Sequence, residues 1–89
     1  MSAAADLEAA AEEELERACT LGWAQLAALT PWGDTYEGFT PAGRTVQFER
    51  NYLWEGPADG DIRVEVMVYE ATAYETGVRL TRTLPSTTN

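Results

Sequence analysis

Hydrophobic and polar residues alternate along two neighbouring stretches in the second half of the chain. Every second position is apolar in both, apart from Arg50 in the first: Val46, Phe48, Tyr52 and Trp54, then Ile62, Val64, Val66 and Val68. A period of two places each set on one face of a β-strand. The segment 55–61 between them is rich in Gly, Pro and Asp, which is typical of a turn. The pattern predicts a long β-hairpin over residues 44–71.

The register of this hairpin follows from centring the turn near Ala58. Both apolar sets then share one face, as a half-buried antiparallel pair requires. The predicted pairs are Trp54 with Ile62, Tyr52 with Val64, Arg50 with Val66, and Phe48 with Val68. The opposite face carries polar residues suited to water: Gln47, Glu49, Asn51, Arg63 and Glu65.

The rest of the chain predicts one helix and further short strands. Apolar residues recur every three or four positions over 1–29, which favours a single helix capped by Ser2 or Asp6, with Gly22 allowing close approach to the sheet. Thr-Pro-x-Gly occurs at 30–33 and 40–43, which predicts two type I turns around a short strand at 35–39. A last strand is expected at 78–84, after a loop at 72–77.

These elements define the expected fold class and domain organisation. An N-terminal helix packs on one face of a three- or four-stranded antiparallel β-meander, which makes an α+β two-layer sandwich. Residues 1–84 form a single domain with a small core, and residues 85–89 form a flexible tail. The core is expected to pack residues of the sheet against Leu15, Trp23 and Leu26 of the helix. These sheet residues are Phe48, Tyr52, Val64, Val66, Val68 and Leu80.

Charge and composition exclude several classes of function. Fifteen acidic residues stand against six arginines, giving a net charge of −9, which disfavours nucleic-acid or anionic-membrane binding. The chain has no histidine and one cysteine, Cys19, which removes imidazole catalysis and His- or Cys-based metal sites. We expect no cofactor, no metal, no membrane span and a cytoplasmic location. The carboxylate pairs Asp34–Glu37 and Asp59–Asp61 lie in predicted loops, and we expect no enzyme activity.

The acidic start of the chain is the first candidate site. Glu8, Glu12 and Glu16 are four residues apart and form one row on a helix, with Glu13 beside them. Such a row is either a solvated face or a surface that binds cations, from within the fold or from another protein. Trp32 and Tyr36 follow the helix and are residue types enriched at interfaces. The candidate partner-binding residues are Glu8, Glu12, Glu13, Glu16, Trp32, Asp34, Tyr36 and Glu37.

Arg50 and Arg82 interrupt the apolar faces of their strands, and both are expected beside Val66. A guanidinium on an inward face needs a partner or must reach the edge. One interpretation pairs these arginines with Glu12, Glu16 or Glu70. The other makes them a clamp for a carboxylate or a phosphate.

The sequence therefore indicates a small, acidic, non-enzymatic module that binds a basic protein. In charge and size the chain resembles inhibitors that occupy basic nucleic-acid-binding surfaces, such as phage anti-restriction or anti-CRISPR proteins. This resemblance is one of composition and not of motif. The alternative is a structural or assembly protein that forms a homodimer or larger homo-oligomer through its sheet edge.

Overall fold

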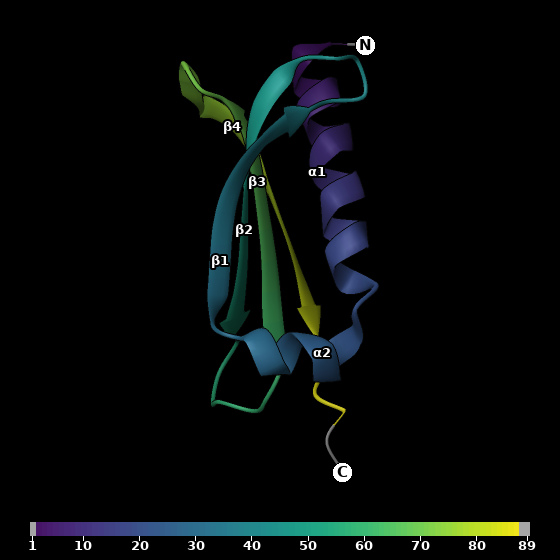
Figure 1. Cartoon of the computed structure of the whole chain (residues 1–89), viewed down its shortest axis with the longest axis vertical. Coiled ribbons are helices and arrows are strands. Elements are labelled where there is room, and N and C mark those ends of the chain that lie inside the picture. The colour runs from purple at the N-terminus through teal and green to yellow at the C-terminus, as the bar shows by residue number, and fades with distance from the viewer. Residues whose placement is uncertain (1, 88–89) are drawn as a thin grey trace.

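A computed structural model describes residues 2–87 as two helices beside a four-stranded sheet (Figure 1). The helices are α1 (Ala3–Cys19) and α2 (Gly22–Leu29). The strands are β1 (Trp32–Phe39), β2 (Thr45–Trp54), β3 (Ile62–Glu70) and β4 (Ala73–Leu84). All neighbours are antiparallel, in the order β1-β2-β3-β4. The predicted α+β two-layer meander is confirmed. Residues 88 and 89 of the expected tail lie outside the described part.

The central hairpin has the predicted register. Trp54 pairs with Ile62, Arg50 with Val66, and the intervening and following pairs agree as well. Glu65 is the exception on the outer face, since only 7% of it is exposed although we expected it to face water. Its carboxylate is covered by Arg63 and Arg79, whose nitrogens lie 3.2 and 2.6 Å from it.

The N-terminal segment is two helices, and the prediction of a single helix over 1–29 is wrong. Ser2 caps α1 as expected, because its hydroxyl accepts from the Ala5 N–H at 3.1 Å. The helix ends at Cys19, and Gly22 follows in the left-handed region at φ 77°. No atom lies within 4 Å of where a Gly22 Cβ would be. Gly22 therefore serves the bend between the helices, and not the close approach to the sheet that we expected.

The outer strands are both longer than predicted. Only the second Thr-Pro-x-Gly motif forms a turn, in which the Gly43 N–H donates to the Thr40 carbonyl at 2.8 Å. The first motif runs directly into β1, which already includes Gly33. β4 begins at Ala73, so most of the expected loop at 72–77 is strand, and its pairing with β3 shifts register between Val68 and Glu70.

The core lies between α1 and the inner face of the sheet. Fully or nearly buried side chains come from α1, α2, β2 and β3, and the partly buried Trp23 and Leu80 pack against them. The buried hydrophobic residues are Leu7, Ala10, Ala11, Leu15, Ala18, Leu26, Val46, Phe48, Tyr52, Ile62, Val64, Val66 and Val68. α1 packs over β3 and β4, whereas α2 runs across one end of the sheet (Figure 1). α1 therefore covers β1 and β2 less than it covers β3 and β4. Neither helix within residues 2–87 is long and apolar enough to cross a membrane.

Candidate protein-binding surface

A hollow of about 180 Å³ separates α1 from β1. β2 forms its floor through Phe48, because α1 is displaced toward β3 and β4. The helix contributes one side and β1 the other; the lining residues are Ala10, Glu13, Glu14 and Arg17, then Tyr36, Gly38 and Phe39. Two of the predicted partner-binding residues, Glu13 and Tyr36, thus meet at this hollow.

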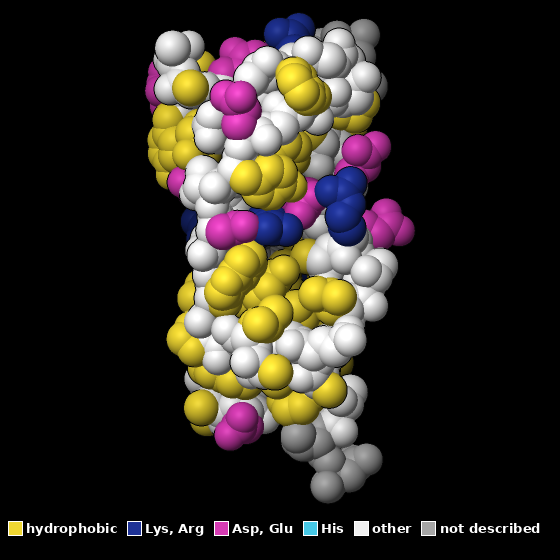
Figure 2. Space-filling model, viewed as in Figure 1, with side chains coloured by type: hydrophobic (Ala, Val, Ile, Leu, Met, Phe, Trp, Pro, Cys, Tyr) yellow, Lys and Arg dark blue, Asp and Glu magenta, His cyan; other side chains and the backbone are white. Residues whose placement is uncertain are grey.

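A network of ion pairs connects β1 to α1 beside this hollow, with Arg50 of β2 at its centre. The Arg50 Nε donates to Asp34 Oδ1 at 2.8 Å, and Nη1 donates to Glu14 Oε1 at 3.2 Å. Glu14 also pairs with Arg17. Figure 2 shows charged side chains of both signs across the middle of this face, with hydrophobic side chains above and below them. The interpretation that paired Arg50 with Glu12, Glu16 or Glu70 is wrong.

Aromatic rings hold Arg50 from both sides. Trp32 stacks on Tyr52 and Tyr36 stacks on Phe48, with ring centroids 4.9 and 5.0 Å apart. The Arg50 guanidinium carbon lies 5.3 Å from the Trp32 centroid and 4.8 Å from that of Tyr36. Such contacts are cation–π interactions.

Two pKa shifts follow from this packing. Burial, reinforced by a hydrogen bond to Glu14, raises the pKa of Tyr36 to about 12. Hydrogen bonding to Asp34 raises the pKa of Arg50. Both side chains therefore keep their ordinary protonation states at neutral pH.

Arg50 and Arg82 do not form the two-arginine clamp. The Arg50 guanidinium is already occupied by Asp34 and Glu14. Arg82 lies opposite Val64 and not Val66, is exposed, and forms no ion pair with any residue in 2–87. β3 lies between β2, which carries Arg50, and β4, which carries Arg82. An anion held by both arginines would need to span two strand spacings.

The acidic row of α1 is exposed. Glu8, Glu12, Glu13 and Glu16 form no ion pair or side-chain hydrogen bond within the described residues. All the arginines except Arg82 pair instead with acids outside this row: Glu14, Asp6, Glu70, Asp34, Glu55 and Glu65. At 100° per residue, Glu12 and Glu16 point away from the sheet, and Glu13 lies on the side of the hollow.

The structure divides the predicted β1 residues between the two faces of the sheet. Trp32, Asp34 and Tyr36 share the inner face and are half-buried by the contacts described above. Glu37 lies on the outer face and is exposed. Asp34 and Glu37 therefore do not converge on one pocket. No group of three or more acidic or cysteine side chains within residues 2–87 is placed to hold a metal ion.

Besides Glu65, two buried acids on α1 were missed from the sequence, Asp6 and Glu14, with exposures of 0% and 1%. Asp6 accepts from the Thr40 hydroxyl and from the Ala42 N–H at 3.0 Å, and Arg44 Nε lies 3.3 Å away. It joins α1 to the β1–β2 loop and does not cap the helix. The signal for Glu14 was present, since it follows Leu7 by seven residues and Ala11 by three, on the apolar stripe.

Comparison with protein-family models, with curated proteins and with solved structures finds no match to this chain.

Proposed function

We propose that this chain is a small non-enzymatic module that binds a basic protein through the exposed acids of α1. The observation that carries the proposal is the distribution of ion pairs. Five arginines are engaged by acids within the fold, and the glutamates of the α1 row receive none of them. Negative charge is therefore concentrated on one side of one helix, where it attracts a cationic partner and speeds encounter.

An apolar contact lies next to Glu13 of this surface. Phe39, at the end of β1, is 70% exposed and lines the same hollow as Glu13 and Tyr36. Exposed aromatic residues beside charged ones are common interface anchors. A partner surface with arginine or lysine around an apolar patch complements this arrangement. Since such basic surfaces bind nucleic acid, the proposed consequence of binding is inhibition by occupying that surface.

The alternative, a homo-oligomer joined at a sheet edge, has less support. β1 is an edge strand, but it carries Asp34 pointing inward and pairing with Arg50. Inward-pointing charges on edge strands oppose edge-to-edge pairing. Leu21 and Leu29, 41% and 48% exposed, offer a different surface for self-association, around α2 and away from the sheet edges.

Affinity capture with three variants tests the proposal. The chain is immobilised as wild type, as Glu8→Gln/Glu12→Gln/Glu16→Gln, and as a matched control, Glu55→Gln/Asp59→Asn/Glu75→Gln. Both triple variants change the net charge equally, and the control residues lie in or beside loops away from α1. Bacterial lysate is applied at low and high salt, and the bound proteins are identified by mass spectrometry.

We expect the wild type and the control to capture basic nucleic-acid-binding proteins. Added DNA or RNA should release these proteins from the immobilised chain. The α1 variant should capture less, and high salt should release the partner because exposed charges are screened. Equal loss in both variants would show that net charge alone attracts the proteins, and would refute a site on α1. Recovery of only the chain itself would favour the homo-oligomer.

A further inference from the structure

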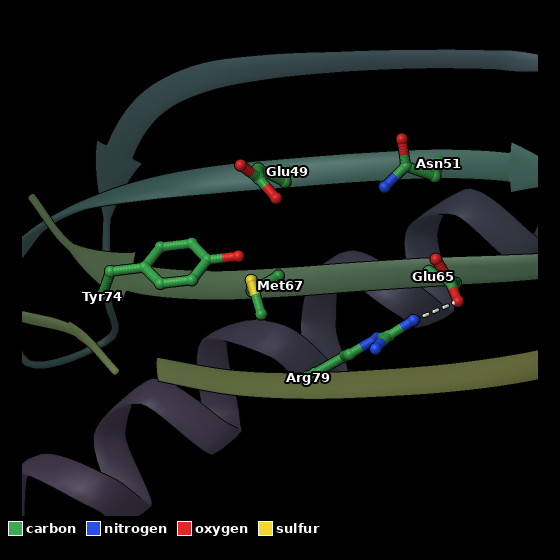
Figure 3. Close-up of a pocket in the computed structure, with 6 residues that line it drawn as sticks. All are labelled: Glu49, Asn51, Glu65, Met67, Tyr74 and Arg79. Carbon is green, nitrogen blue, oxygen red and sulfur yellow. Dashed lines mark hydrogen bonds and ion pairs between the residues drawn. The ribbon is translucent and has the colours of Figure 1, made fainter. Parts of the chain in front are cut away.

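The outer face of the sheet, opposite α1, has a second hollow of about 240 Å³ (Figure 3). Glu49 and Asn51 of β2 line one side and Arg79 of β4 the other. Met67 and Glu65 of β3 lie between them, and Tyr74 closes one end. The volume is below that of a typical small-molecule pocket, so the hollow is suited to a single side chain.

Among the described residues, the charges around this hollow leave one carboxylate without a cation. Glu65 is paired with Arg79 and Arg63, and Arg63 also lies 3.7 Å from Glu55. These two acids and two arginines cancel each other. Glu49 forms no ion pair within residues 2–87 and accepts one hydrogen bond, from the neutral Tyr69 hydroxyl at 3.1 Å. That bond orients the carboxylate without neutralising it.

The apolar part of the hollow is also preformed. Tyr74 is 53% exposed, and its ring packs edge-on against Tyr69 with centroids 4.7 Å apart. In Figure 3 the Tyr74 hydroxyl points toward the side of Met67 and Glu49. Met67 supplies a flexible apolar surface between them. An accessible aromatic face beside a carboxylate suits a cation carried on an aliphatic stem.

We propose that this hollow accepts an arginine side chain from a partner protein. The stem would lie on Met67, the planar guanidinium would stack on Tyr74, and its N–H groups would donate to the Glu49 carboxylate. Arginine fits better than lysine because its planar fork both stacks on a ring and donates to the two oxygens of one carboxylate. The net charge of −9 favours the approach of such a cation. This site is on the opposite side of the sheet from α1 and does not depend on the proposed function.

Two-dimensional NMR of the ¹⁵N-labelled chain tests the proposal with a blocked Gly-Arg-Gly peptide. We expect weak, saturable shifts confined to residues around Glu49, Met67 and Tyr74. The same peptide with citrulline is the neutral isostere, and it should bind at least about tenfold more weakly because the charge-assisted hydrogen bonds are lost. Agmatine carries the same guanidinium on a free small molecule. Binding of agmatine without binding of the peptide would overturn the assignment to a protein side chain.

Glu49→Gln is the decisive variant, because glutamine keeps an acceptor for the Tyr69 hydroxyl. We expect it to weaken peptide binding roughly five- to tenfold, since it removes the unpaired charge. Glu12→Gln makes the same change of charge on α1 and should alter binding by less than about twofold, since its charge is distant and screened. Tyr74→Ala should weaken binding as well, and a heteronuclear spectrum confirms that each variant is folded. Equal weakening by Glu49→Gln and Glu12→Gln, or binding of the citrulline peptide as tightly as arginine, would refute the site.

Discussion

The two sides of α1 carry the same kind of residue in opposite circumstances. Asp6 and Glu14 face the protein and are buried, each held by an arginine and by further hydrogen bonds. Glu8, Glu12, Glu13 and Glu16 face solvent and have no such partner within the described residues. One helix thus uses its acids both to fix its position on the sheet and to present a negative surface.

The difference matters because a buried carboxylate and an exposed one respond differently to change. Removing the partner of a buried charge leaves it without compensation in a medium that solvates it poorly. Removing an exposed charge loses little stability and changes mainly the long-range potential. Substitutions that separate folding from binding should therefore divide along the two sides of α1.

The largest effect on stability is expected from Arg50→Met. This change leaves Glu14 with Arg17 as its remaining ion-pair partner within the described residues, and it removes the cation between the Trp32 and Tyr36 rings. We expect a loss of about 2–4 kcal/mol, at the lower end of the range for broken buried pairs because Asp34 reaches solvent. Urea denaturation measures it. Arg82→Met is the control on the same face of the sheet, and it should change stability by less than about 0.5 kcal/mol. Equal losses would mean that the Arg50 network contributes nothing specific.

A smaller effect is expected from Asp6→Ala. It removes the acceptor for Thr40 and for the Ala42 N–H, and Thr40 is 4% exposed, so its hydroxyl loses a partner that water cannot fully replace. The expected loss is about 1–3 kcal/mol. Glu8→Ala, two residues away on the exposed side, is the matched control and should stay within about 0.5 kcal/mol of wild type. Thermal and urea unfolding of both variants compare them; similar values would contradict the anchoring role of Asp6.

The fold was predictable where a single pattern of apolar residues determined the strand register. Alternation in β2 and β3 allowed only one register that buried both apolar sets, and that register is observed. The bend at Gly22 was missed because the apolar spacing continues across it, so periodicity alone could not reveal the left-handed residue. β4 extends to Ala73 through a register shift, and its first residues alternate too weakly to be recognised from the sequence.

The candidate site was predictable only in part. The exposed row on α1 followed from helical spacing. The two partners of Arg50, Glu14 and Asp34, could not be predicted in this way. They are distant in sequence and meet only when α1 lies along the sheet. Glu65 shows the same limit on the other face. Alternation placed it correctly on the outer side, but its burial depends on Arg79 of β4, whose pairing the hairpin pattern does not include.

The smallest effect on stability is expected when Glu8, Glu12 and Glu16 are all changed to Gln. The row contains two like-charged pairs at a spacing of four residues, each of which costs a few tenths of a kcal/mol. Because these acids have no partner within the described residues, nothing is lost in exchange, and stability should rise by no more than about 1 kcal/mol. The gain should shrink in high salt, where the repulsion is already screened. Urea denaturation at low and high salt measures both the gain and its decline. A loss of stability at either salt concentration would show that the row contributes to folding, and the comparison between the two sides of α1 would fail.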